Sequence, residues 1–133
     1  MVRGSDIVIV EGIGGVMVPL AKDTLVIDLM VEMKLPVLIV ARSRLGTLNH
    51  TLLTVEMCRM RGLKVAGVVL NGYRSDSADL AEESNARIIT EVGKIEVAAV
   101  IPYDKETCVE RGKLGAEVRS AAALIRWEEK LEG

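Results

Sequence analysis

The segment PVLIVA at residues 36–41 decides the fold class, because it is a short, unbroken run of apolar residues. Three similar runs read DIVIV at residues 6–10, VAGVVL at 65–70 and VAAVI at 97–101. Continuous apolar runs, unlike alternating ones, are typical of strands that are covered on both faces, as in a parallel sheet between helices. The sequence therefore predicts four strands in a mostly parallel sheet.

Helical patterns fill the intervals between these runs. They share apolar positions at helical spacing and cover residues 24–33, 51–61, 77–92 and 116–131. Gly62 and Gly93 follow two of them as stop signals. Trp127 is expected on the buried face of the last helix. This alternation predicts βαβ units in a single α/β domain over residues 1–133, with a Rossmann-like three-layer arrangement.

Composition excludes several classes of partner. The chain has 133 residues, half of them hydrophobic, with 17 basic and 19 acidic residues and a net charge of -2. This balance gives no basic field for nucleic acid and no polybasic membrane anchor. No segment approaches the roughly 20 apolar residues of a membrane span, and no signal peptide is recognisable. Cys58 and Cys108 form no CxxC motif, so we expect two reduced thiols in a cytoplasmic protein.

Ligand sites in open parallel sheets lie beyond the carboxyl ends of the strands. The segments at these positions are rich in Gly, Asn, Pro or charge: EGIGG at 11–15, residues 42–50, NGY at 71–73 and PYD at 102–104. They are the candidate binding loops.

Glu11 stands at the end of the first predicted strand, before a loop with little side-chain bulk. Glycines let a backbone approach a ligand closely and present N–H groups to anionic oxygens. A carboxylate there suits Mg²⁺, which prefers oxygen ligands shared with substrate phosphates. The alternative is a tight turn with a solvated glutamate. No G-x-x-x-x-G-K-[ST] phosphate-binding motif occurs in the chain.

The other candidate loops each have two interpretations. Asn49 either caps the helix that follows it or binds a ligand. The only histidine, His50, has no carboxylate or cysteine partner at a recognisable spacing, which favours a structural role. Asn71 either hydrogen-bonds a base edge through its amide or serves as a turn residue. Arg42 and Arg44 either attract an anionic substrate or lie in a solvated loop.

Read in order, a series of motifs closely resembles the dethiobiotin synthase family from about Asp6 to Tyr103. The motifs are D-x-VIVEG-x-GG at residues 6–15, PL at 19–20, LPV at 35–37, LGTLNH at 45–50, GL at 62–63, GVVLN at 67–71 and IPY at 101–103. The LGTLNH stretch is the most specific of them. The resemblance implies a P-loop NTPase-like fold and a homodimer.

The resemblance also implies a reaction. These enzymes join CO₂ to 7,8-diaminopelargonate with Mg·ATP and close a cyclic urea, giving dethiobiotin, ADP and phosphate. A carbamate attacks the γ-phosphate, and the second amine then expels phosphate from the mixed anhydride. Catalysis of this kind consists mainly of positioning and of cations aimed at the charge that develops on the phosphoryl oxygens.

Carried over to this chain, the family pattern implies a role for each matching residue. Glu11 would be a Mg²⁺ ligand, and the nucleotide would contact Gly12, Ile13, Gly14, Asn71, Gly72, Pro102, Tyr103 and Asp104. Gly46 and Asn49 would reach the diamine bound by the neighbouring subunit. Asn85 stands near the place of the substrate-contacting tyrosine of the family, which has no clear match.

The family begins with a strand, a phosphate-binding loop and catalytic lysines, and this chain contains none of them. We therefore expect the chain alone to be catalytically incomplete. The alternative is a non-catalytic nucleotide-binding or regulatory dimer module without the phosphate-binding loop. A related amidoligase acting on another acid is a third hypothesis.

Overall fold

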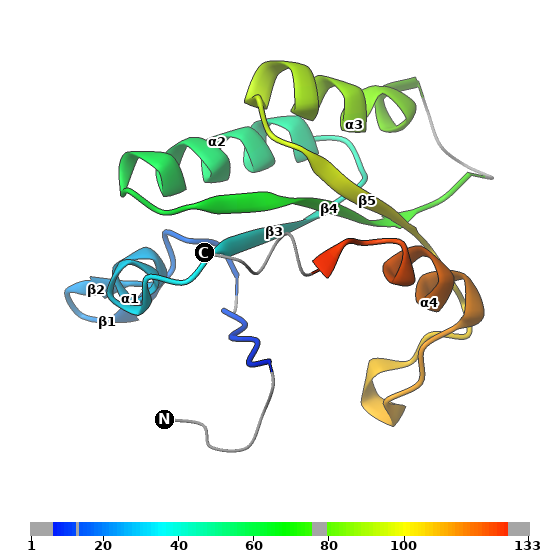
Figure 1. The fold of residues 1–133 in the computed structure, drawn as a ribbon, viewed down its shortest axis with the longest axis horizontal. Coiled ribbons are helices and arrows are strands. Elements are labelled where there is room, and N and C mark those ends of the chain that lie inside the picture. Colours follow the sequence, from blue (N-terminus) through cyan, green and yellow to red (C-terminus); the bar gives the residue numbers. More distant parts are fainter. Residues whose placement is uncertain (1–6, 13, 76–79, 128–133) are drawn as a thin grey trace.

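A three-stranded parallel sheet forms the centre of the computed structural model, which describes residues 7–12, 14–75 and 80–127 (Figure 1). Its strands are β3 (Val37–Arg42), β4 (Val65–Tyr73) and β5 (Val97–Pro102), in the order β3-β4-β5. They correspond to three of the four predicted runs. Both strand pairs are parallel, which confirms the predicted α/β class.

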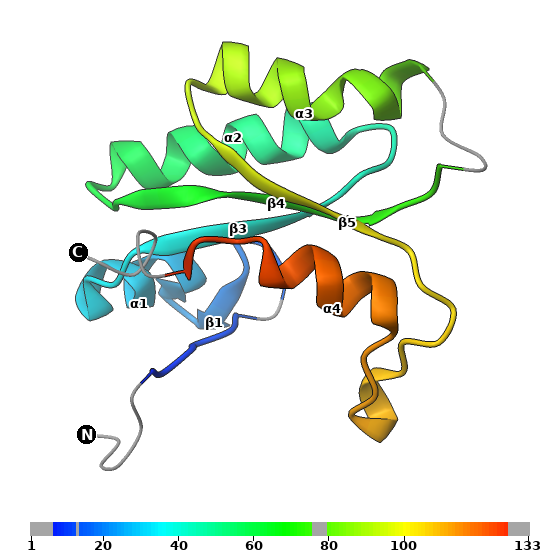
Figure 2. The same ribbon diagram turned by 45° about the vertical axis from the view of Figure 1, so that its right-hand side comes forward.

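Helices cover both faces of this sheet. The remaining elements are the hairpin β1 (Pro19–Ala21) and β2 (Thr24–Leu25), the helices α1 (Val26–Met33), α2 (Thr47–Met60), α3 (Leu80–Gly93) and α4 (Ala116–Ala123), and the 3-10 turn η1 (Val109–Arg111). Helices α2 and α3 lie side by side on one face, and α4 lies on the other (Figures 1 and 2). The architecture therefore has three layers. No helix in the described part of the chain is long and apolar enough to cross a membrane.

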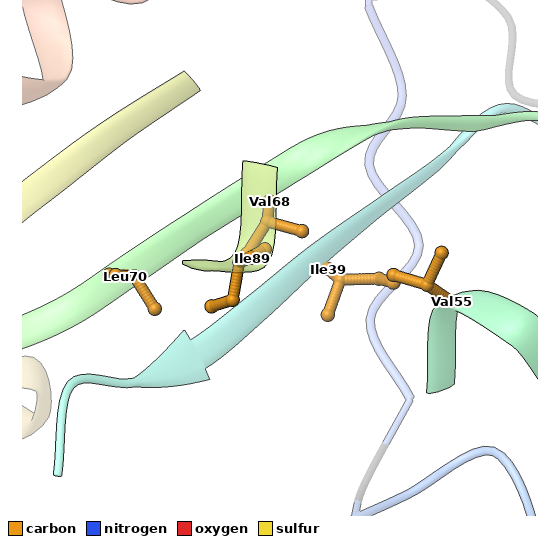
Figure 3. Close-up of a cluster of buried hydrophobic side chains, with 5 residues drawn as sticks. All are labelled: Ile39, Val55, Val68, Leu70 and Ile89. Atoms are coloured by element: carbon orange, nitrogen blue, oxygen red, sulfur yellow. The ribbon is translucent and has the colours of Figure 1, made fainter. Parts of the chain in front are cut away.

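The core between the sheet and α2 and α3 is made of aliphatic side chains. Figure 3 shows its five buried members: Ile39, Val55, Val68, Leu70 and Ile89. A second cluster joins the sheet to α4 through Val69, Ile101 and Ile125. A third, around Ile27 and Cys58, packs α1 against α2 and the first residues of β3 and β4. Cys58 is a free, buried cysteine, and burial raises the pKa of its thiol.

The predicted strand at residues 6–10 does not form in the part of the chain that the structure describes. Residues 7–10 have no strand pairing, and their side chains are exposed, up to 85% for Ile9. Asp6 lies outside the described residues. An apolar run shows a tendency to form a strand, but a strand also needs a neighbour that pairs with its backbone. None of the described residues supplies that neighbour.

The predicted start of α2 and the predicted end of α4 were also wrong. Helix α2 begins at Thr47, four residues earlier than predicted, and Gly46, not Asn49, occupies the N-cap position with φ 92°. Helix α4 ends at Ala123. Ile125 takes the buried place beyond that end, and Trp127 is 40% exposed, so the prediction of a buried tryptophan on this helix was wrong. Helix α3 is described from Leu80, and residues 77–79 of its predicted range lie outside the described residues.

Candidate functional site

The carboxyl ends of β3 and β4 bring candidate residues from two loops together. Arg42, the last residue of β3, is paired with Asn71 on β4, and Asn71 is paired with Ile101 on β5. Strand β4 extends through Tyr73, so the predicted loop at 71–73 belongs to the strand. The register shifts at Gly72, which has φ 79° and open space around it. Such an irregularity re-aims the side chains beside it.

A pocket of about 230 Å³ opens at this edge. Its lining residues are Arg42, Arg44, Asn71, Gly72 and Tyr103. Neither Arg42 nor Arg44 has an ion-pair partner among the described residues, and the lining includes no acidic side chain. The pocket therefore combines an amide, an aromatic ring and two unneutralised guanidinium groups. That combination suits a ligand with both a planar polar ring and negative charge.

Arg74 is not part of the lining, but it contacts the lining residue Tyr103, and the sequence patterns did not predict this contact. Its Cζ lies 3.7 Å from the centre of the Tyr103 ring, a cation–π arrangement. Its Nε is buried and has no hydrogen-bond partner in the described structure. The Tyr103 backbone N–H donates to the Tyr73 carbonyl at 2.7 Å, which fixes the ring beside the end of β4. The only sequence signal for this contact was the basic residue directly after the NGY segment.

Pro102 and Asp104 flank Tyr103 but do not line the pocket. Pro102 is the last residue of β5 and is paired with Tyr73. The Asp104 carboxylate accepts backbone hydrogen bonds from Glu106 at 2.8 Å and from Glu117, in the first turn of α4, at 3.1 Å. Asp104 therefore ties the loop after β5 to α4.

The glycine loop, which contains Glu11, Gly12 and Gly14, does not contribute to the lining of this pocket. A Cβ on Gly12 would lie 3.4 Å from Val26, at the start of α1, and Ile27 N–H donates to the Val16 carbonyl. Gly14 has φ 83°, and Glu11 and Gly14 are exposed. In both views the blue segment that carries this loop lies beneath β3, apart from the carboxyl ends of the strands (Figures 1 and 2). The expected grouping of the glycine loop with Asn71 and Tyr103 is therefore not found in this structure. Ile13 lies outside the described residues.

Gly46 and Asn49 lie at the exposed start of α2, next to the loop of Arg44. The His50 side chain is also exposed. Beyond them, Leu53 (62% exposed) and Met60 (78% exposed) continue the outer surface of the helix, and Leu45 before the helix is 86% exposed. Asn49, Leu53 and Met60 are spaced four and seven residues apart, which places them on one helical face.

Comparison with known proteins identifies the family. A family model described as an AAA domain matches residues 2–111. The ATP-dependent dethiobiotin synthetase BioD of Bacillus subtilis (strain 168) is 46% identical over 94 residues, which are 71% of this chain and 40% of that protein. The protein of the same name from Neorickettsia sennetsu is 44% identical over 100 residues, 74% of this chain and 39% of that protein. The chain belongs to the dethiobiotin synthetase family.

A longer match covers most of the chain. The dethiobiotin synthetase BioD of Bacillus cereus is 36% identical over 129 residues, which are 93% of this chain and 53% of that protein. The chain thus spans about two fifths to one half of the length of these dethiobiotin synthetases. The match includes the α4 region, which the motif comparison had not reached.

Proposed function

We propose that this chain is part of an ATP-dependent dethiobiotin synthetase and supplies the part of its active site that holds the nucleotide base. The pocket between Arg42, Asn71 and Tyr103 is the observation that carries this proposal. In the whole enzyme, CO₂ and 7,8-diaminopelargonate would be joined at the expense of ATP in the biotin pathway. We expect the protein in the cytoplasm.

Each lining residue has a chemical task in this proposal. The Asn71 side chain is exposed and both donates and accepts hydrogen bonds, so it can pair with the edge of a base. The Tyr103 ring, already stacked under Arg74, offers a flat surface beside it. Arg42 and Arg44 supply positive charge for the anionic part of the ligand. Gly72 would shape the base pocket through its backbone, and Pro102 and Asp104, which flank Tyr103 outside the lining, would border the base.

Glu11 is our candidate ligand for Mg²⁺. The described residues contain no group of three His, Cys, Asp or Glu side chains that could hold a metal by themselves. This fits Mg²⁺, which commonly takes one or two carboxylates and completes its coordination with substrate phosphates and water. The ion would neutralise charge on the triphosphate. Gly12, Ile13 and Gly14 would lie against the phosphate and carbamate groups, and this role requires the glycine loop to come closer to the pocket.

The exposed face of α2 supports a homodimer. Leu45, Leu53 and Met60 expose apolar side chains around Asn49, and apolar groups that cluster on one surface mark interaction sites. A second copy seated on this face would cover them. Gly46 and Asn49 would then reach the diamine in the partner's site.

The sheet itself supports the expectation that further structure completes the active site. Strand β3 has no partner on its outer side among the described residues, and the apolar residues Ile7 to Val10 are exposed and unpaired. Such edges are normally paired or covered. We propose that a strand and phosphate-binding loop absent from this chain fill this position and that the chain alone does not turn over substrate.

Calorimetric titration with ATP tests the nucleotide proposal. We expect saturable binding of ATP to the wild-type chain, strengthened by Mg²⁺. Binding to Asn71→Ala should be roughly tenfold weaker, because the hydrogen bonds between the Asn71 side-chain amide and the base are lost. Asn49→Ala is the matched control, since it removes the same amide from the partner-facing surface and should leave the dissociation constant unchanged. Equal affinities for wild type and Asn71→Ala would refute the assignment of the base pocket.

A non-catalytic nucleotide-binding or regulatory module remains the second candidate, because the chain lacks the phosphate-binding motif but has the pocket at Arg42, Asn71 and Tyr103. Incubation with diaminopelargonate, bicarbonate and Mg·ATP, followed by mass spectrometry of dethiobiotin, separates the two. Product that appears only after addition of a polypeptide bearing the phosphate-binding loop supports the enzyme. Product from the chain alone would contradict our view that it is incomplete, and no product in either mixture favours the module.

A further inference from the structure

Four polar side chains are buried where α2, α3 and the loop after β3 meet. Ser43 is 1% exposed, Thr47 5%, Thr51 2% and Asn85 2%. The two threonine hydroxyls lie 3.3 Å apart and satisfy each other. A buried polar side chain is costly unless it is hydrogen-bonded. The contact that Asn85 makes therefore explains why an amide, and not an aliphatic side chain, occupies this part of α3.

Asn85 reaches across to the loop between β3 and α2. Its Nδ2 donates to the Ser43 carbonyl at 3.1 Å, a contact between residues 42 positions apart in the chain. The Ser43 N–H in turn donates to the Asn71 carbonyl at 3.3 Å. A chain of two hydrogen bonds thus links α3 to the residue at the centre of the pocket.

The loop held in this way carries the positive charge of the pocket. Arg42 and Arg44 flank Ser43 directly, and both line the pocket. Thr47 N–H donates to the Arg44 carbonyl at 3.1 Å, so the same loop also sets the start of α2. The Ser43 hydroxyl is buried without a partner among the described residues. The carbonyl of Ser43, not its side chain, is therefore where this loop is fastened to α3.

We propose that Asn85 is a positioning residue of the nucleotide pocket. It holds residues 43–46 against β4, so that Arg42 and Arg44 face Asn71 and Tyr103 across the pocket. Asn85 is buried and contacts the loop instead of the ligand. This role rests on the proposed function, because it assumes that the pocket binds a nucleotide. The anchoring of the loop follows from the hydrogen bonds of Asn85 and Ser43 alone.

Two substitutions at position 85 test the anchor. Asn85→Leu keeps the number and branching of the side-chain heavy atoms and removes the donor, and Asn85→Ala removes the donor without the larger volume of leucine. Thr90→Ala on the same helix is the matched control, because Thr90 is exposed and its hydroxyl donates to the Ala86 carbonyl of its own helix. Ile89→Val, at a fully buried neighbouring position, controls for a general loss of stability.

The first readout is amide hydrogen exchange, which reports local opening separately from global unfolding. In both Asn85 variants we expect protection of the Ser43 and Thr47 amides to fall roughly tenfold more than that of Val68 in the sheet, the equivalent of one lost hydrogen bond. Ile89→Val should lower protection by one common factor, and Thr90→Ala should change neither amide. An equal loss at Ser43, Thr47 and Val68 in the Asn85 variants would overturn the anchor.

The second readout is the dissociation constant for ATP. Loosening the loop should weaken ATP binding by roughly fivefold to tenfold in the Asn85 variants and leave it unchanged in Ile89→Val, since only the former frees the pocket arginines. Freed loop amides with an unchanged ATP affinity would overturn the positioning role. A wild-type chain that binds no ATP would refute the proposed function instead, and the exchange data would then decide the anchor by themselves.

Discussion

Replacing Gly115 by alanine tests how the loop that carries Tyr103 is held against α4. A Cβ at position 115 would overlap the Asp104 carboxylate, which accepts the backbone hydrogen bonds of Glu106 and Glu117. Gly115 has φ -67° and ψ 161°, values that alanine adopts without strain. The damage must therefore come from displacement of Asp104 and not from the backbone of residue 115.

The expected magnitude follows from two opposing effects. Loss of a carboxylate acceptor from the first turn of a helix costs about 0.5–2 kcal/mol. A glycine-to-alanine change offsets about 0.4–1 kcal/mol of this, because it restricts the unfolded chain. We expect Gly115→Ala to lower the free energy of unfolding by about 1 kcal/mol. In an Asp104→Ala background the overlap disappears, and the same change should raise it by about 0.5 kcal/mol.

Urea unfolding followed by far-ultraviolet circular dichroism measures all four members of this double-mutant cycle. The predicted coupling between positions 104 and 115 is about 1.5 kcal/mol, well above the deviation from additivity of independent sites. Additive effects, which means an equal loss from Gly115→Ala in both backgrounds, would show that Asp104 does not fasten this loop to α4.

Two further predictions concern acid stability and assembly. The pKa of Asp28 is lowered chiefly by the hydrogen bond that its carboxylate accepts from the Leu25 N–H, and next by its hydrogen bond with Arg61. A lowered folded-state pKa stabilises the fold above the unfolded value of about 4, and this contribution disappears as the pH falls through the folded value. Urea midpoints measured across this range should therefore decline less in Asp28→Asn than in wild type, and parallel curves would contradict the Asp28 contribution. Leu53→Glu should convert the proposed dimer to a monomer in sedimentation velocity, because it places charge in the apolar contact proposed for α2. The control Arg87→Glu, on α3, should leave the dimer intact. A dimer that persists in Leu53→Glu would exclude this face of α2 as the interface.

The sequence predicted the elements whose signals are local and the strands that find partners. The runs at 36–41, 65–70 and 97–101 became β3, β4 and β5 because each pairs with another member of the same set. The run at 6–10 has equal apolar character, but residues 7–10 have no partner in the described structure. Pairing depends on residues distant in sequence, so an apolar pattern alone does not determine it.

In the candidate site, too, local signals were predictable from the sequence and contacts between distant residues were not. Asn71, Gly72 and Tyr103 were predicted because they follow strands, and the parallel register brings them to one edge with Arg42 and Arg44. The role of Asp104 at the nucleotide stays a prediction from resemblance, and the hydrogen bonds that its carboxylate accepts from Glu106 and Glu117 N–H were not predicted. The contacts of Arg74 with Tyr103 and of Asn85 with Ser43 join separate elements. Their partners follow only from the packing of those elements, which no local motif encodes.

Nucleotide binding at the pocket beside the carboxyl ends of the strands can be tested by mapping ATP-induced amide shifts. We expect two-dimensional ¹⁵N–¹H spectra of the chain, titrated with Mg·ATP, to show saturable shifts concentrated at Arg44, Asn71, Gly72 and Tyr103, with Val109 and Leu124 unaffected. Shifts that are absent, or that concentrate away from the pocket while these amides stay fixed, would contradict it.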